Sequence, residues 1–239
     1  MANGKAGAME GETRAQAKAL LVVLRSHANP ANVAGMARYG INPKGTLGVP
    51  VPILRRLAKE AGKNHTLALA LWESGVHEAR ILATLVDEPA RVTWRQMEGW
   101  ARDFDSWDVC DHASHNLFRY TPHAFAKAVK WAHAKPEFVR RAGFSLMAGL
   151  AVKAKTACEA AFEAFLPLIE EAAGDDRNMV KKAVNWALRG IGKRNRRLLA
   201  QAIRTAEAIR LQDSKSARWI AADALRELRN PATVARIKE

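Results

Sequence analysis

The chain has 239 residues, 49% of them hydrophobic, and its 38 lysines and arginines outnumber its 24 acids to give a formal net charge of +14. This composition excludes a disordered chain, and no apolar run is long enough to cross a membrane. The basic excess makes a polyanion the expected partner, and a content of two cysteines argues against a disulfide framework and for a reducing cytoplasm.

The start of the chain differs in pattern from the rest. Residues 1–12 lack the apolar core of a secretory signal, and we expect them to form a disordered tail. From residue 13 onward apolar residues recur with a helical period, and alternating strand patterns are weak. Between breaks at proline and glycine we expect helices over residues 13–27, 31–39, 51–61, 65–73, 77–87, 93–103, 107–119, 123–133, 137–153, 157–173, 177–193, 196–210 and 214–229.

The expected helices are joined in pairs by short turns, and the pairs recur at roughly 35–45 residues, a period typical of helical repeat proteins. We therefore predict an all-α fold of the HEAT-like repeat class, an α-solenoid in which antiparallel helix pairs form a curved, right-handed superhelix. No long linker interrupts residues 13–239, so we expect them to form a single domain.

The stretch FDSWDVCDHASH, residues 104–115, places a small acidic and aromatic cluster in this basic chain. On a helical wheel, Trp107 and Asp111 lie one turn apart on the side that faces away from the apolar residues. Core packing explains most tryptophans, but it does not explain one on this side. The opposite, core-facing side carries Val109, Cys110, Ala113 and Leu117.

Other members of the cluster have simpler explanations. Asp105, Ser106 and Asp108 fit the start of a helix, where side-chain oxygens and negative charge are favourable. The wheel places His112 well away from Asp111, so we expect no metal site here. A thiol on the core side, as expected for Cys110, is inert as a nucleophile.

Two later helices also carry unusual residues opposite their apolar stripes. In the helix over 137–153, Arg141 lies beside small residues that would let a phosphodiester approach, although an ordinary surface arginine is an equal alternative. In the helix over 177–193, the residues opposite the apolar stripe are Lys182, Trp186, Arg189 and Lys193. Basic residues interleaved with an aromatic ring are typical of nucleic-acid surfaces.

The basic charge is concentrated in one segment. Residues 177–218 contain twelve lysines and arginines against two acids, a net charge of +10. A solvated helix face is the usual explanation of a charge run. A segment that holds most of the excess charge over a regular apolar stripe better fits a surface for nucleic acid.

Several stretches resemble one family, the DNA alkylation repair glycosylases of the AlkD type, from about residue 20 to residue 230. NPANVAGMARYG and LGVPVPILRRLAK are similar to the family's opening repeat, and LWESGVHEARILA is similar to the next block. SWDVCD resembles the catalytic Trp-Asp motif, FVRRAGF carries the motif arginine, and VKKAVNWALRGIGKRN resembles the Trp-x-x-Arg helix. Pro50 departs from the family pattern, in which some relatives have a polar residue.

The resemblance implies a glycosylase that removes cationic N3- or N7-alkylated purines, of the 3-methyladenine and 7-methylguanine type, from duplex DNA without a cofactor or metal. It implies Trp107 and Asp111 as catalytic residues, with Asp111 stabilising an oxocarbenium-like sugar or positioning water. It implies DNA contacts by Arg141, Trp186, Arg189 and, secondarily, Tyr39, to which the wheel adds Lys182 and Lys193. The family is thought to leave the lesion in the duplex, so no deep base pocket is expected.

Two other functions stay open. Some relatives bind branched or damaged DNA without excision, and those lack the Trp–Asp pair that this sequence has at Trp107 and Asp111. A protein-interaction scaffold would instead expose apolar or mixed-charge grooves. For the glycosylase we expect double-stranded DNA as partner, no membrane association, a monomer, and a cytoplasmic, nucleoid-associated location.

Overall fold

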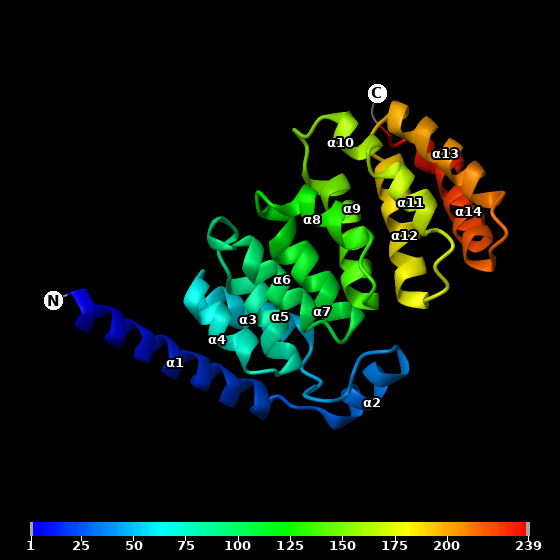
Figure 1. The fold of residues 1–239 in the computed structure, drawn as a ribbon. Coiled ribbons are helices and arrows are strands. Elements are labelled where there is room, and N and C mark those ends of the chain that lie inside the picture. Colours follow the sequence, from blue (N-terminus) through cyan, green and yellow to red (C-terminus); the bar gives the residue numbers. More distant parts are fainter. Residues whose placement is uncertain (1, 238–239) are drawn as a thin grey trace. The chain divides into compact units, whose positions relative to one another are not determined.

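The computed structural model describes residues 2–237, with side chains from residue 11 onward, and every regular element in this part of the chain is helical (Figure 1). The all-α prediction is therefore confirmed. The chain forms two compact units, Met1–Thr121 and Pro122–Glu239, each with its own buried core. The sequence also predicted a single domain and a curved superhelix. Both concern the arrangement of the two units, and they stay predictions.

The first unit consists of short helices joined by tight connections. Its elements are α1 (Ala2–Ser26), α2 (Pro30–Arg38), α3 (Val51–Ala61), α4 (His65–Glu73), α5 (His77–Val86), η1 (Pro89–Arg91), α6 (Trp94–Arg102), α7 (Trp107–His112), the π-helical turn η2 (Ala113–Leu117) and η3 (Phe118–Tyr120). Polar caps explain several starts: the side chain of Asn29 accepts hydrogen bonds from two amides at the start of α2, and that of Asn64 accepts one from the amide of Leu67 in α4.

Aromatic rings fill the centre of the first unit. Trp72 of α4 and Trp100 of α6 stack with their ring centroids 3.9 Å apart, and Phe104 and Phe118 pack around them. The indole of Trp72 also donates to the carboxylate of Asp103 over 2.8 Å. These tryptophans are core residues, unlike Trp107.

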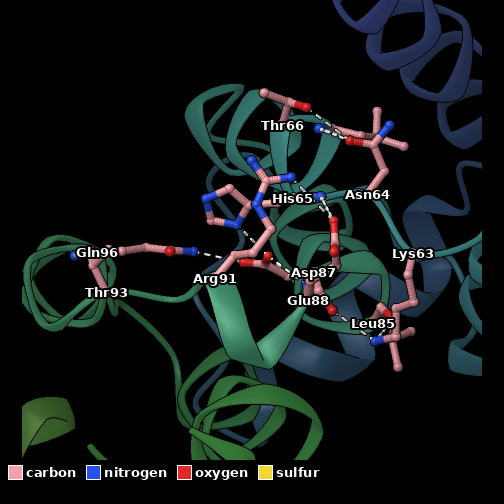
Figure 2. Close-up of polar contacts among 11 residues, drawn as sticks. Lys63, Asn64, His65, Thr66, Leu85, Asp87, Glu88, Arg91, Thr93 and Gln96 are labelled. Atoms are coloured by element: carbon pink, nitrogen blue, oxygen red, sulfur yellow. Dashed lines mark hydrogen bonds and ion pairs between the residues drawn. The ribbon is translucent and has the colours of Figure 1, made fainter. Parts of the chain in front are cut away.

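A buried carboxylate joins the ends of α4, α5 and α6 (Figure 2). Asp87, whose side chain is fully buried, lies 2.7 Å from the ring nitrogen Nδ1 of His65 and accepts a hydrogen bond of 2.7 Å from the amide of Gln96. Lys63 donates to the backbone carbonyls of Leu85 and Asp87, each over 2.8 Å. Both oxygens of the carboxylate have a partner, so no buried charge is left unpaired. The network therefore fixes the three helix ends relative to one another.

The second unit contains the longer helices. Its elements are α8 (Ala124–Ala132), α9 (Glu137–Lys153), α10 (Glu159–Glu163), α11 (Leu166–Ala172), α12 (Asn178–Gly192), α13 (Arg196–Arg210), α14 (Lys215–Leu228) and α15 (Pro231–Val234). Helix α9 packs against both α8 and α12, and α13 and α14 form a pair that also packs against α12.

Three elements differ from the sequence-based expectation. The helix expected over 157–173 is broken into α10 and α11, because Pro167 has no backbone N–H and can lie only in the first turn of a new helix. Where a disordered tail was expected over 1–12, the backbone of α1 is helical from Ala2. The expected helix over 107–119 changes to a π-helical turn at Ala113. No helix among residues 2–237 is both long and apolar enough to span a membrane.

Close packing of α9 on α8 depends on Gly143. A Cβ at this position would lie 2.6 Å from the backbone nitrogen of Ala132 and 2.8 Å from the carbonyl carbon of Trp131. Neither backbone atom can move without displacing α8, so the two helices approach as closely as they do only over a glycine.

We expect Gly143→Ala to lower the free energy of unfolding by about 2–4 kcal/mol, since overpacking against backbone is costly. Gly99→Ala in α6 is the matched control: a Cβ there meets nothing within 4 Å. That variant should be more stable than the wild type by about 0.5–1 kcal/mol from helix propensity alone. Urea unfolding of both variants measures the difference, and equal stabilities would contradict the packing explanation.

Candidate functional site

The first unit contains a pocket of about 720 Å³ that opens beside α7. Its walls come from α2, the connection 39–50, the start of α3 and α7 with η2. We call it the Asp111 pocket, after the half-buried carboxylate in its wall. Besides Asp111, residues used below that line it are Tyr39, Val49, Arg55, Trp107, His112 and Asn116.

Trp107 and Tyr39, predicted separately from distant parts of the sequence, meet at this pocket. The indole nitrogen Nε1 of Trp107 donates a hydrogen bond of 3.0 Å to the backbone carbonyl of Tyr39. Tyr39 is 74% exposed, while Trp107 is half-buried. The fold therefore brings together Tyr39, Trp107 and Asp111 at one opening.

A buried carboxylate holds the connection between α2 and α3 in place. Glu78 of α5 is 1% exposed, and it accepts hydrogen bonds from the backbone amides of Leu47 (2.8 Å), Gly48 (2.6 Å) and Val49 (3.2 Å). Gly48 has a φ of +78°, and a Cβ there would lie 2.3 Å from the carbonyl oxygen of Asn29. The pocket wall thus has one backbone conformation, which only glycine permits at position 48.

The acids at the start of α7 have a different role from the one expected. The hydroxyl of Ser106 accepts a hydrogen bond of 2.9 Å from the backbone amide of Asn42 and makes no cap bond to its own helix. Asp105 accepts a bond of 2.9 Å from the side-chain amide of the same Asn42. Ser106 thus stands at the N-cap position as expected, but its hydroxyl serves a tertiary contact: with Asp105 it ties α7 to the connection that forms the opposite wall.

Asp108 forms a buried pair with His77, which precedes Glu78 in α5. The ring nitrogen Nε2 of His77 lies 2.8 Å from one carboxylate oxygen of Asp108, and the other oxygen accepts from the amide of Val109 over 2.9 Å. Burial alone would lower the pKa of His77, but the hydrogen bond and charge of Asp108 outweigh it and raise the pKa above its ordinary value. Asp108 is thus a tertiary contact as well as a first-turn residue.

His112 also lines the Asp111 pocket, although the wheel placed it well away from Asp111. The wall extends along α7 into η2 and is broad enough to include both neighbouring side chains. Nδ1 of His112 lies 3.1 Å from the side-chain nitrogen of Asn116, which also donates to the hydroxyl of Thr84 over 3.0 Å. Burial lowers the pKa of His112.

Other chemistry has little support in the described part of the chain. Among residues 2–237 no three histidine, cysteine or acidic side chains lie together in a way that could hold a metal ion. Cys110 lies in the core, as predicted, and is fully buried.

In the second unit, Arg141 is not the surface residue that the wheel predicted. It is 6% exposed, and its Nη1 donates a hydrogen bond of 2.6 Å to the backbone carbonyl of Met179. The reason is that α9 packs on two sides, against α8 and α12, so a wheel with one core side misassigns the residues between them. Ser145 and Ala148, the small neighbours, are buried too. Contact of Arg141 with DNA stays a prediction.

The basic stripe of α12 is partly neutralised by acids of α14. Arg189 lies 2.6 Å from Glu227 and 3.3 Å from Asp223, and Lys193 lies 2.5 Å from Glu227. Burial would raise the pKa of Glu227, but the hydrogen bonds and charges of Lys193 and Arg189 lower it. Lys182 is exposed and has no ion-pair partner among the described side chains, and Trp186 is half-buried. Lys182 is therefore the cation of the stripe best placed to meet an anion.

Sequence reasoning missed three residues of this region: His77 and Glu78, which position the pocket walls, and Asn116 in the wall itself. It considered His112 only as a metal ligand. The signal for Glu78 was present, since two glycines close together at 45 and 48 mark a strained connection that needs hydrogen-bond partners. The signal for Asn116 was absent, because its place depends on the π-helical turn.

Asp108→Asn should remove the stabilisation that the pair with His77 provides. Because the pKa of His77 is raised above its unfolded value of about 6.5, this contribution is complete below that pH and is lost as the pH rises through the folded pKa. We expect the variant to lose about 1.5–3 kcal/mol of unfolding free energy at pH 6 and less at pH 9. Denaturant unfolding at both pH values measures this.

The NMR titration of His77 gives a second readout, in which Asp108→Asn should lower its pKa. Asp213→Asn is the control, because Asp213 is fully exposed and forms a surface ion pair with Arg218. A loss in Asp108→Asn that does not change with pH would mean that the pair is not charged.

Comparison with known proteins agrees with this architecture. A solved structure from a family of proteins related to the HEAT-like repeat DNA glycosylases, with affinity for branched DNA structures, superposes with a TM-score of 0.75. It is 16% identical, and the match covers 93% of this chain and 97% of that one. A designed armadillo repeat protein in complex with a (KR)4 peptide is 14% identical, with 77% of this chain and 78% of that one covered, and its TM-score is only 0.38.

No curated protein is similar enough to this chain to match it. The fold is thus the HEAT-like repeat fold of the first of these structures, as predicted. The family model described as DNA alkylation repair enzyme matches residues 20–228, which is most of the sequence. The chain therefore belongs to the DNA alkylation repair enzyme family.

Proposed function

We propose that the protein is a DNA glycosylase that hydrolyses the N-glycosidic bond of cationic alkylated purines, of the 3-methyladenine and 7-methylguanine type, in duplex DNA. The observation that carries the proposal is the pair of Trp107 and Asp111 at the mouth of an open pocket, in a basic member of this family. A carboxylate and an indole at such a place suit a reaction that develops positive charge.

The chemistry needs little from the protein apart from charge. N3- or N7-alkylation makes the base a cation that departs neutral, so no general acid has to protonate it. The sugar becomes oxocarbenium-like, and the carboxylate of Asp111 stabilises that charge or positions the attacking water. The indole of Trp107, held by the carbonyl of Tyr39, adds a cation–π attraction of about 0.5–2 kcal/mol.

The second unit would supply contacts to the phosphates. Lys182 needs no rearrangement to do so, whereas Arg189 and Lys193 have to exchange Glu227 for phosphate. We propose that Trp186, Arg141 and, in the first unit, Tyr39 contribute as well. The enzyme would use no cofactor or metal and act as a monomer on chromosomal DNA in the cytoplasm, at the nucleoid.

A second candidate is a protein that binds DNA structures without excision. It is favoured by the similarity in fold to a protein family with affinity for branched DNA. It does not account for an acid and an indole placed together at a pocket, which a purely phosphate-binding surface has no use for. A protein-interaction scaffold is the third candidate and does not account for the charge of +14.

Asp111→Asn should keep the shape of the site and remove its charge. If the carboxylate stabilises a sugar cation, the variant loses stabilisation of the transition state. Single-turnover excision of 7-methylguanine should then drop by about 10²-fold or more. Affinity for the duplex should hold or rise slightly. Asp213→Asn removes the same charge from a fully exposed site outside the pocket and should behave as the wild type. Equal excision rates for both variants would exclude Asp111 from the mechanism.

Binding to undamaged duplex should depend on salt. Each phosphate contact releases a counterion, so several contacts should weaken affinity by at least about tenfold between 50 and 200 mM salt. Lys182→Ala should reduce the slope of log Kd against log salt, and Lys193→Ala should reduce it less because Glu227 already neutralises that lysine. Fluorescence anisotropy at four salt concentrations measures both. An affinity that ignores salt would exclude a polyanion as partner.

A further inference from the structure

A second, smaller hollow lies beside the Asp111 pocket in the first unit. It has a volume of about 320 Å³, and we call it the Lys59 hollow. The second half of α3, the two residues that follow it and the end of α5 form its walls. The lining residues are Arg55, Ala58, Lys59, Gly62, Lys63 and Leu85. Arg55 lines the Asp111 pocket as well, so the two hollows share part of one wall.

The Lys59 hollow is lined by three cations and, within the described chain, by no acidic residue. Arg55 and Lys59 are exposed, lie one turn apart on α3, and have no ion-pair partner among the described side chains. Like charges at this spacing repel each other and weaken a helix. The helix dipole favours Lys59 in the last turn, but it does not favour Arg55 in the middle of the helix. An anion that meets these charges explains them better than the stability of α3 does.

Lys63 is held in place at the edge of the hollow (Figure 2). Its ammonium donates to the backbone carbonyls of Leu85 and Asp87, each over 2.8 Å, and these bonds use two of its three N–H groups. The carboxylate of Asp87 instead accepts from Gln96 and lies 2.7 Å from the ring of His65. The charge of Lys63 is therefore fixed in position, and no acid among the described side chains neutralises it by direct contact.

An extended polyanion fits these charges better than a small free anion. Exposed cations bind a single anionic group weakly, because water and salt screen the attraction. A nucleic-acid strand presents phosphates at regular intervals, and each contact releases a counterion and so adds to affinity. Arg55 and Lys59 are one helical turn, about 5.4 Å, apart along α3, so their long side chains can reach separate phosphates of one strand.

The position of Arg55 relates the hollow to the Asp111 pocket. Burial is the main reason for the lowered pKa of His112, and the charge of Arg55 adds to it, which places the guanidinium close to that wall. A strand whose sugar faces Asp111 would therefore have a phosphate at Arg55. Its following phosphates would lie over Lys59 and Lys63.

We propose that the Lys59 hollow binds the phosphodiester backbone of the lesion-bearing strand next to the lesion, with Lys59 and Lys63 as the contacting cations. This inference rests on the proposed action on duplex DNA and adds a phosphate-binding site in the first unit. The contacts are made to phosphates on the outside of the duplex, so no base has to leave the stack.

Lys59→Gln tests the site, and Arg56→Gln is the matched control. Both residues are exposed on α3, and both changes lower the net charge by one, so their long-range electrostatic effects are equal. Arg56 differs in two respects: it lines neither hollow, and it lies 3.9 Å from Glu60 in an ion pair.

The first measurement is the affinity of each protein for an undamaged duplex at several salt concentrations. Loss of one phosphate contact should weaken binding by Lys59→Gln about two- to fivefold at low salt and lower the slope of log Kd against log salt by about 0.9. Arg56→Gln should change both quantities less than half as much. Equal changes in the two variants would overturn the site and leave the proposed function standing. Because this arm needs no excision, it also decides the case in which the wild type binds duplex DNA but excises nothing.

The second measurement locates the contact relative to the lesion. Uncharged methylphosphonates replace single phosphates on either side of 7-methylguanine in one strand. At one or two positions next to the lesion they should weaken binding by the wild type and Arg56→Gln, with no further effect on Lys59→Gln. Equal sensitivity of Lys59→Gln and the wild type at every position would overturn the contact. Inorganic phosphate that binds the wild type but not Lys59→Gln, with duplex affinity equal for the two, would assign the hollow to a free anion and overturn the strand as its occupant.

Discussion

The site depends on two adjacent residues of α5. The carboxylate of Glu78 accepts from three backbone amides of the connection between α2 and α3, and the ring of His77 pairs with Asp108 of α7. A buried carboxylate without such partners would cost several kcal/mol, so these bonds are also what makes its burial possible. Since one rigid helix turn holds both walls, the distance between them, and with it the Asp111 pocket, is set by α5.

The acidic cluster in a basic chain has two separate functions in this account. Asp105 and Asp108 are structural, because they hold α7 to its neighbours through Asn42 and His77. Asp111 lines the pocket, and under the proposed function its carboxylate serves the chemistry there. In the second unit, acids of α14 form ion pairs with part of the basic excess. The acidic residues thus gather at α7 in the first unit, and most of the basic excess lies in the second unit.

The sequence predicted the fold class, and it placed Trp107 and Asp111 on one helix face, because both rest on local helical periodicity that the structure retains. Both residues line the pocket, and their catalytic role stays a prediction. The sequence-based prediction failed where contacts between distant segments decide the environment of a side chain. A wheel assumes one buried side, and Arg141 lies on a helix packed on two. The partner of Arg189, Glu227, is 38 residues away, and nothing in either segment announces that pairing. Tertiary contacts, not propensities, decided each of these.

The most direct test is a duplex that contains one 7-methylguanine, incubated with excess protein and then treated with alkali to cut at abasic sites. The account predicts strand cleavage at that position alone, with none in the same duplex that carries guanine. Tight binding of both duplexes without any abasic site would contradict it and leave a DNA-binding protein without excision activity.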